Sequence, residues 1–281
     1  MSTITPQAIV SHYASYAPHY SRHAELQKIT AHELQERLGI INIEINNILD
    51  LGCGPGFLSK NLQKRFKTAK LHLLDLSPDM LVLAKKHKPW FRKIELIQEN
   101  ANSMPLADDC MDLVISNLML QQNPDPDAVF AEVQRVTREN GLFTFTTLGP
   151  DSFKELRQAM ISAHIDFPED AFGHLTDMHD IGDALVRNGL REPVLDVDLL
   201  KLSYANFSDL WKELLITGCV LQDISNSEMD KLAQSYPRAG HSEDYQVSIE
   251  VVYAQAWAGD GKSRARTPDE VHIPLSRIQR R

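Results

Sequence analysis

Hydrophobic residues recur at helical spacing over the first 40 positions of the chain. Within two runs the apolar side chains stand three or four positions apart, at Ile9, Tyr13, Tyr16 and Tyr20, and then around Leu26, Ile29, Leu34 and Leu38. This is the period of one face of an α-helix, and Gly39 ends it. The pattern predicts helical structure from 7 to 38, which we expect to form an amino-terminal cap over residues 1–47.

From 48 to 148, short apolar runs alternate with amphipathic stretches. The runs predict strands at 48–51, 71–76, 94–98, 112–116 and 142–148, and the stretches predict helices at 57–66, after 77 and at 127–138. Ser77 and Pro78 suit the cap and the first turn of the second helix. The alternation predicts an α/β fold with a parallel, doubly wound, Rossmann-like sheet, and places a ligand at the carboxyl ends of its strands.

The pattern changes after Pro150. Helices are predicted at 151–164 and 178–188, the second capped by Asp177 and ended by Gly189, and strands at 194–203 and 245–257, with a mostly helical segment at 207–236. We expect the last two strands to pair as a hairpin with a helical insert, within a substrate-side region at 149–257. The polar, basic tail at 258–281 is expected to be weakly ordered.

Three glycines, Gly52, Gly54 and Gly56, stand between the first predicted strand and the first helix of the core. Such a loop lets the backbone approach a ligand closely, although a tight turn without a ligand is the alternative. With Asp50 and Cys53, the spacing resembles motif I of class I methyltransferases rather than the dinucleotide pattern. The resemblance implies S-adenosylmethionine as the cofactor, with Asp50 orienting the loop and the methionine end.

Further candidates for the cofactor site follow the next strands. Asp75 ends the second strand, where a carboxylate accepts hydrogen bonds from both ribose hydroxyls and repels a 2'-phosphate. Asn100 stands where many such enzymes place an acid against the adenine amino group, and its amide oxygen also accepts, although a loop cap explains it as well. We also expect cofactor contacts from Leu76, Met80, Ala101, Asn117 and Leu118.

Composition and charge narrow the function. A formal net charge of −9 argues against nucleic acid as the main substrate. The apolar stretches fall short of the ~20 residues that span a bilayer, the start shows no secretory signal, and three widely spaced cysteines suit a reducing compartment. We therefore expect a cytoplasmic protein without a membrane segment. The segment 173–180 is rich in metal-ligand types, but a helix start explains it, and we expect no metal.

Several stretches resemble the malonyl-[acyl-carrier protein] O-methyltransferases of biotin synthesis. They comprise Tyr20 to Gln27, Ser116 to Leu118 with Gln121, 145–157 and 177–185, and the resemblance covers about 7–257. It implies methyl transfer from S-adenosylmethionine to the free carboxylate of a malonyl thioester on acyl-carrier protein. A carboxylate is ionised at neutral pH and requires no general base, so catalysis would rest on positioning and on partial exclusion of water.

The resemblance also suggests roles for individual residues. Tyr20 would close over the methyl group and orient the acceptor; the alternative is a tyrosine of the core. Arg157 would pair with the malonyl carboxylate; the alternative is an exposed helix residue without a role. Gln27 is a weaker candidate on the cap. The sequence departs from the family at Ser21, Asn100 and Gln122, the last of which replaces a tryptophan. Acyl-carrier protein is acidic, so a basic cluster would dock it. The two clusters are Lys60, Lys64, Arg65, Lys67 and Lys70, and Lys85, Lys86, Lys88, Arg92 and Lys93.

Three other functions are compatible with the same residues. One is an assembly factor of respiratory complex I. Such a factor has a similar fold and modifies an arginine of a partner subunit. Another is a small-molecule O-methyltransferase acting on a hydroxyl, which would need a base such as His23. The third is a regulator that binds the cofactor without turnover. Nothing in the sequence indicates an oligomeric state.

Overall fold

The computed structural model describes residues 4–259 except for 42, 87–93, 169 and 239–243. Part of the second basic cluster, at 88–93, lies outside the described residues, as does nearly all of the tail predicted to be weakly ordered.

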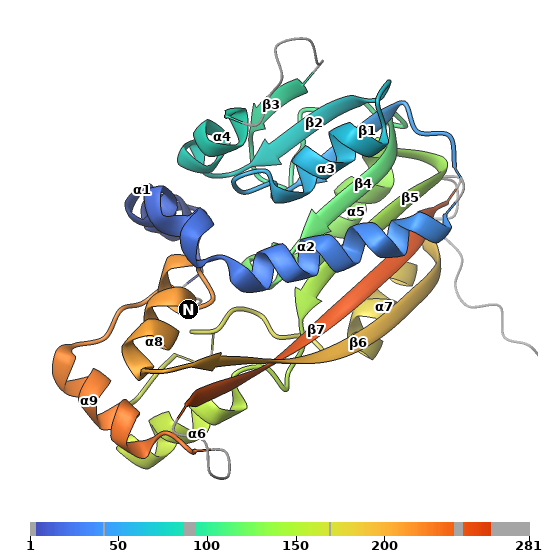
Figure 1. Ribbon diagram of the computed structural model, residues 1–281. Coiled ribbons are helices and arrows are strands. Elements are labelled where there is room, and N and C mark those ends of the chain that lie inside the picture. The colour runs from blue at the N-terminus through green and yellow to red at the C-terminus, as the bar shows by residue number, and fades with distance from the viewer. Residues whose placement is uncertain (1–3, 42, 87–93, 169, 239–243, 260–281) are drawn as a thin grey trace, which may run out of the picture.

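A seven-stranded sheet forms the centre of the described chain, in the order β3-β2-β1-β4-β5-β7-β6 (Figure 1). The strands are β1 Asn47–Leu51, β2 Lys70–Asp75, β3 Ile94–Gln98, β4 Met111–Asn117, β5 Thr137–Leu148, β6 Leu190–Tyr204 and β7 Tyr245–Ala258. β1 to β5 are parallel, whereas β7 runs antiparallel between β5 and β6. The predicted α/β sheet and the predicted pairing of the last two strands are confirmed.

Helices cover both faces of this sheet, and two separate apolar clusters form between the layers. The helices are α1 Pro6–His23, α2 Glu25–Arg37, α3 Phe57–Arg65, α4 Pro78–Lys85, α5 Pro126–Val136, α6 Lys154–Ala163, α7 Met178–Arg187, α8 Phe207–Ile216 and α9 Asn226–Ser235, with 3-10 turns η1 Leu38–Ile40 and η2 Leu120–Gln122. α2, α3 and α4 pack on one face, and α5 and α7 on the other (Figure 1). α6, α8 and α9 gather near the β6–β7 hairpin.

The amino-terminal helical pattern is divided into two helices, which the sequence did not predict. The chain leaves helical geometry at Ala24, with φ −90° and ψ 54°, between α1 and α2. α2 lies across the sheet, whereas α1 turns away and packs against α4 and α8 (Figure 1). Its apolar face, including Tyr13 and Tyr20, meets Met80 and Ile216. The break therefore brings α1 over the carboxyl ends of the strands.

Two predicted helix caps are present. Ser77 Oγ accepts from the Met80 amide at 3.3 Å, and Asp177 Oδ1 accepts from the His179 amide at 2.8 Å. The caps explain why these helices begin where they do. Within the described ranges, no helix is long and apolar enough to cross a membrane, and no group of three or more potential metal ligands occurs.

Candidate functional site

A cleft opens at the carboxyl ends of β1, β2 and β4, under α1. This is the point of the sheet where strand order reverses between β1 and β4, the usual ligand position in such folds. The cleft has about 660 Å³ of space free of protein atoms, part of it open to solvent. It is lined by Ile9, Tyr13, Tyr20, Gly52, Gly54, Leu74, Asp75, Leu76, Met80, Glu99, Asn100, Ala101, Asn117, Leu118, Met119, Gln122 and Asn123.

The glycine loop is fixed to the end of β2 by backbone hydrogen bonds. The amides of Gly52 and Cys53 donate to the Leu74 carbonyl at 2.8 and 3.0 Å. Gly52 has φ +69°, and a Cβ built there would lie 2.4 Å from Cγ of Met119. A side chain at this position would therefore strain the backbone and displace a wall of the cleft. Gly56 precedes α3 and does not line the cleft.

Asp75 joins the glycine loop to the start of α4. Its Oδ2 accepts from the Gly54 amide and its Oδ1 from the Ser77 amide, both at 2.8 Å. Burial raises the pKa of Asp75 to about 6, against the opposing effect of these hydrogen bonds. Each carboxylate oxygen retains a further lone pair, and the residue lines the cleft. The arrangement fits the predicted acceptance of two ribose hydroxyls.

A smaller pocket of about 300 Å³ adjoins the cleft and shares Tyr20, Gly52, Gly54 and Asn117 with it. Gln27, Asp50, Cys53, Pro55, Phe57 and Leu58 also line it. Asp50 is fully buried; its Oδ2 accepts from Ser59 Oγ at 2.6 Å, but its Oδ1 has no partner among the described residues. Oε1 of Gln27 is likewise buried and has no partner in the described part of the chain.

These two unpartnered oxygens suit a ligand that carries several N–H donors. Buried acceptors without partners are costly, and the α-ammonium group of an amino acid would supply three donors. S-adenosylmethionine has such a group at one end and a ribose at the other, matching Asp50 with Gln27 and Asp75 respectively. The residues of this chain therefore fit the cofactor that motif I implies.

Glu99, Asn100 and Ala101, at the start of the loop between β3 and β4, form one wall of the cleft. Asn100 lines the wall, but its Oδ1 accepts from the Asn102 amide at 3.0 Å, so the loop-cap alternative is present in the structure. The oxygen keeps one lone pair for an adenine amino group. Asn123 Nδ2 donates to Asn102 Oδ1 at 2.7 Å and so ties this turn to the segment after η2.

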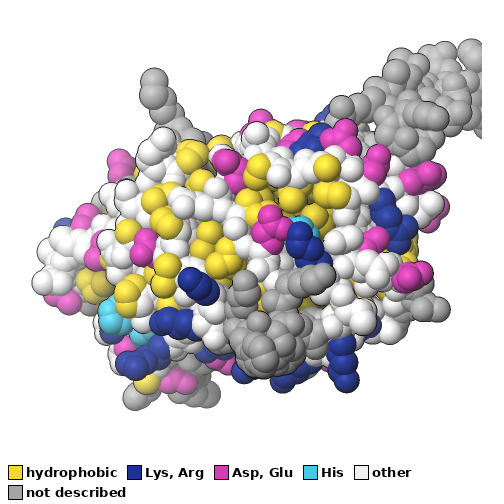
Figure 2. Space-filling view, turned by 90° about the horizontal axis from the view of Figure 1, so that it is seen from above, with side chains coloured by type: hydrophobic (Ala, Val, Ile, Leu, Met, Phe, Trp, Pro, Cys, Tyr) yellow, Lys and Arg dark blue, Asp and Glu magenta, His cyan; other side chains and the backbone are white. Residues whose placement is uncertain are grey.

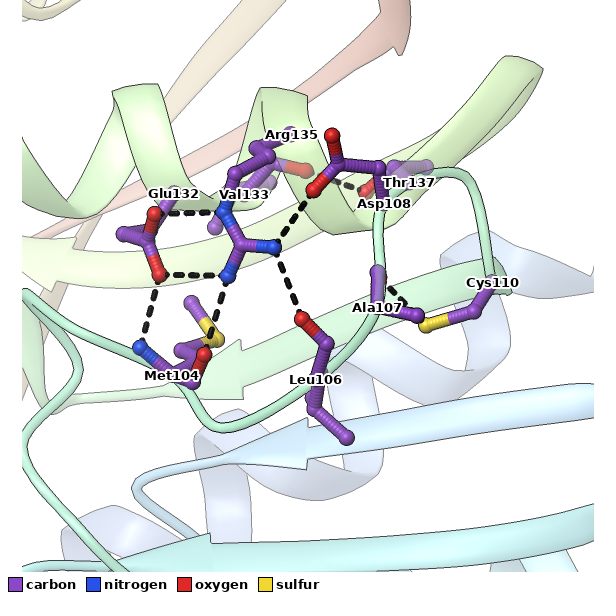
Figure 3. Close-up of polar contacts among 9 residues, drawn as sticks. All are labelled: Met104, Leu106, Ala107, Asp108, Cys110, Glu132, Val133, Arg135 and Thr137. Carbon is purple, nitrogen blue, oxygen red and sulfur yellow. Dashed lines mark hydrogen bonds and ion pairs between the residues drawn. The ribbon is translucent and has the colours of Figure 1, made fainter.

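Arg135 of α5 holds the same loop from behind (Figure 3). Its guanidinium donates to the carbonyls of Met104 and Leu106, at 2.9 and 2.7 Å, and to Asp108 at 2.7 Å. Glu132 receives two further bonds from the guanidinium and accepts from the Met104 amide at 2.6 Å. The loop has no helix to pair its backbone groups, and the side chains of α5 serve this purpose.

Asn117 and Leu118, at the end of β4, connect the sheet to α2. Asn117 Nδ2 donates to the Gln27 carbonyl at 3.0 Å, and its Oδ1 accepts from Thr146 at 2.8 Å. The Leu118 amide donates to the Thr146 carbonyl at 3.1 Å. The side chain of Asn117 is therefore occupied in fixing Gln27 beside the smaller pocket.

Tyr20 reaches both pockets. Its side chain is 8% exposed, and its ring stacks on Phe57 and meets Tyr13 edge-on, with centroids 6.3 and 5.9 Å apart. Burial holds the pKa of Tyr20 well above its usual value, so the hydroxyl stays protonated at neutral pH. No hydrogen-bond partner for this hydroxyl occurs in the described parts of the chain. Tyr20 is thus a donor available to a ligand.

The structure does not bring Arg157 to this site. Arg157 lies on α6, which packs against α9 and β7 at the other end of the molecule from α1 and α4 (Figure 1). Its Nη2 donates to the Pro150 carbonyl at 2.5 Å, and it lines neither pocket. The family resemblance of the segment 145–157 did not indicate how far Arg157 lies from the carboxyl ends of the strands.

Some cleft residues were not predicted as part of the site. Tyr13 and Gln122 line it from α1 and η2, while Glu99 and Met119 neighbour predicted residues. The only sequence signal for Tyr13 was its place on the same helical face as Tyr20. Gln122 departs from the tryptophan of the family pattern, but nothing in the sequence places it at the cleft.

Comparison with known proteins agrees with this architecture. Residues 44–187 match the model of a methyltransferase domain family. The chain is 36% identical to a malonyl-[acyl-carrier protein] O-methyltransferase of Legionella pneumophila, covering 95% of both chains. It is 33% identical to an enzyme of the same name from Halorhodospira halophila, covering 94% of this chain and 92% of the other. A methyltransferase-fold structure from Bacillus halodurans superposes with a TM-score of 0.59 at 16% identity, over 81% of this chain and 99% of that one.

The fold and the cleft together define a class I methyltransferase that uses S-adenosylmethionine. Within that class, the chain belongs to the malonyl-[acyl-carrier protein] O-methyltransferase family.

The buried carboxylates make cofactor affinity depend on pH. Burial raises the pKa of Asp50 to about 7 and that of Asp75 to about 6, so the ligand-free protein holds protons that an ammonium group and two hydroxyl donors displace. Binding therefore releases protons and strengthens as pH rises. We expect the dissociation constant for S-adenosylmethionine to fall roughly 10- to 100-fold from about pH 5.5 to about pH 8.

Titration calorimetry in two buffers of different ionisation enthalpy measures both the affinity and the released protons. An Asp50→Asn variant serves as the control, because it should lose the part of the pH dependence centred near neutrality. A dissociation constant that stays flat over this range would contradict the protonation of these carboxylates in the free protein.

Proposed function

We propose that this enzyme transfers a methyl group from S-adenosylmethionine to the free carboxylate of a malonyl thioester on acyl-carrier protein, an early step of biotin synthesis, in the cytoplasm. The names of its relatives support the substrate. Three unpaired cysteines, Cys53, Cys110 and Cys219, support a reducing compartment.

One observation supports a carboxylate as the methyl acceptor. Among the described residues, no histidine, lysine or arginine lines either pocket. The tyrosines of the cleft have raised pKa values, and the carboxylates lie where the cofactor is held. His23, the candidate base for a hydroxyl acceptor, lines neither pocket. A site without a base near the acceptor suits a group that is already ionised, such as a carboxylate.

A neutral hydrogen-bond donor is sufficient to recognise the acceptor carboxylate at this site. When bound, S-adenosylmethionine supplies an electrophilic methyl group on a positively charged sulfur. The acceptor carboxylate loses its charge during transfer, so a guanidinium would stabilise the ground state more than the transition state. Tyr20 instead offers one neutral hydroxyl from an almost buried position, which orients the acceptor and keeps water from its side of the cleft.

Substitution of Tyr20 separates this role from that of a core tyrosine. We expect Tyr20→Phe to lower kcat/KM for the malonyl thioester about 10-fold, the equivalent of one hydrogen bond to a charged group. Its affinity for S-adenosylmethionine should be unchanged, because the ring and its stacking on Phe57 remain. Arg157→Ala is the matched control and should keep the wild-type kcat/KM. A Tyr20→Phe enzyme as active as the wild type would remove the proposed role.

The carrier protein would dock on basic side chains around the cleft. Burial lowers the pKa of His23, and the charges of Lys212, Arg22 and His19 lower it further. These groups therefore lie together at the junction of α1 and α8. Figure 2 shows dark blue and cyan side chains gathered at one edge of the face that is seen from above. In the first predicted cluster, Lys70 at the start of β2 is paired with Glu95, and Arg65 at the end of α3 donates to two backbone carbonyls. Lys60 and Lys64 of α3 have no such partner among the described residues. These positions support attraction of an acidic partner.

Product formation tests the proposal directly. The purified protein is incubated with methyl-labelled S-adenosylmethionine and either malonyl-acyl-carrier protein or malonyl-coenzyme A, and alkali-labile methyl ester is counted. We expect labelled ester, with the higher kcat/KM on the carrier protein and a loss of that preference at high salt. Cofactor binding without labelled ester on either thioester would overturn it in favour of the assembly-factor or regulator functions.

A further inference from the structure

Tyr13 and Gln122 meet at a junction of three chain segments beside the cleft. The Tyr13 hydroxyl accepts from Gln122 Nε2 at 2.8 Å and has two acceptors in reach, Gln122 Oε1 at 3.1 Å and the Thr217 carbonyl at 3.2 Å. Gln122 Nε2 also donates to the Gly218 carbonyl at 2.9 Å. The network thus joins α1, η2 and the turn after α8.

Gly218 lies in close contact with both side chains of this network. Gly218 has φ +76°, and a Cβ built there would lie 2.4 Å from the Tyr13 hydroxyl oxygen and 2.6 Å from Gln122 Nε2. Tyr13 is 7% exposed, so its hydroxyl would be costly to leave unpaired. Both amide donors of Gln122 and the hydroxyl donor of Tyr13 are used inside the network, so none of them is free for a ligand.

Tyr13 and Tyr20 are seven positions apart on α1 and therefore face the same side, two helical turns from each other. Their rings are in edge contact, and both line the cleft. Apolar residues such as Ala17, Met80 and Ile216 pack on this face, and the buried His12 of α1 forms a hydrogen bond with the backbone of Leu215. Apolar contacts do not fix the rotation and translation of a helix as directional hydrogen bonds do.

We infer that Gln122 is a positioning residue for methyl transfer: through Tyr13 it fixes the placement of α1, and so holds the Tyr20 hydroxyl over the acceptor side of the cleft. Gln122 itself does not touch the acceptor in this role. A tryptophan, which the family pattern has at this position, has a single N–H donor and no oxygen acceptor. A tryptophan therefore cannot donate to both Tyr13 and the Gly218 carbonyl, as Gln122 does in this chain.

The test compares Gln122→Met, Tyr13→Phe and the double variant, with Gln158→Met, an exposed position on α6, as the control. Methionine keeps the length of glutamine and phenylalanine keeps the ring, so packing is retained while the hydrogen bonds are lost. We expect each single variant to lower kcat about 10-fold on malonyl-acyl-carrier protein and to keep its affinity for S-adenosylmethionine within about twofold. The double variant should be no worse than either single one, because both remove one network.

A second measurement does not depend on the acceptor. Hydrogen–deuterium exchange of the α1 amides should rise about 10-fold in all three variants, while exchange in β1 and β4 stays at the wild-type rate. The kinetic arm rests on the proposed function, and the exchange arm does not: a wild-type enzyme inactive on malonyl thioesters would refute that function but leave the exchange prediction standing. Additive losses in the double variant, or α1 exchange unchanged from the control, would overturn the positioning role.

Discussion

An Asp75→Ala variant is expected to bind S-adenosylmethionine at least about 100-fold more weakly than the wild type while remaining folded. Two hydrogen bonds between ribose hydroxyls and a carboxylate are lost, each worth about 1.5–3 kcal/mol, and 1.4 kcal/mol corresponds to a tenfold change in affinity. The amides of Gly54 and Ser77 lose their acceptor as well, which loosens the loop that approaches the cofactor. Activity should fall in parallel, through a higher KM for the cofactor.

Calorimetric titration and thermal unfolding measure the two parts of this prediction. Asp79→Ala is the matched control, since Asp79 lies in the first turn of α4 only four positions away but does not line the cleft. It should retain wild-type affinity. If Asp75→Ala bound the cofactor within about threefold of the wild type, the carboxylate would not be the ribose acceptor.

Much of the fold follows from local sequence. Strands β1 and β2, of five and six residues, alternate with helices α3 and α4, of nine and eight residues, and such alternation predicts a parallel sheet. The caps at Ser77 and Asp177 begin their helices as the sequence indicated. Asp75 and the glycine loop were identified because both follow strand ends, and the carboxyl ends of neighbouring parallel strands meet at one edge. The local sequence pattern is therefore sufficient to predict a candidate site residue when that residue directly follows a strand.

The rest of the site depends on contacts between distant segments. Tyr13 and Gln122 are 109 positions apart, and their pairing requires α1 to turn at Ala24, where neither glycine nor proline signals a break. Arg157 illustrates the converse, because its segment was correctly predicted as helical but packs against α9. The spacing of residues along the chain does not encode the direction in which a helix packs, which is set by tertiary contacts.

An Arg135→Met variant should lose about 2–4 kcal/mol of unfolding free energy. Its guanidinium pairs two backbone carbonyls and two carboxylates (Figure 3), and Glu132, whose side chain is 18% exposed, loses its cation. Removing one member of a half-buried pair costs more than removing an exposed one, because the partner stays partly desolvated. Methionine keeps most of the apolar stem, so the loss reports the hydrogen bonds.

The same substitution should weaken S-adenosylmethionine binding about 10-fold, because Arg135 fixes the loop whose first residues line the cleft, and loop ordering then adds to the cost of binding. Arg187→Met is the control: its bidentate pair with Asp127 is exposed on both sides and should contribute less than about 1 kcal/mol. Urea unfolding and calorimetry give both quantities. If Arg135→Met lost stability but kept full cofactor affinity, the loop would be held in its binding geometry by Asn102 and Asn123 rather than by α5.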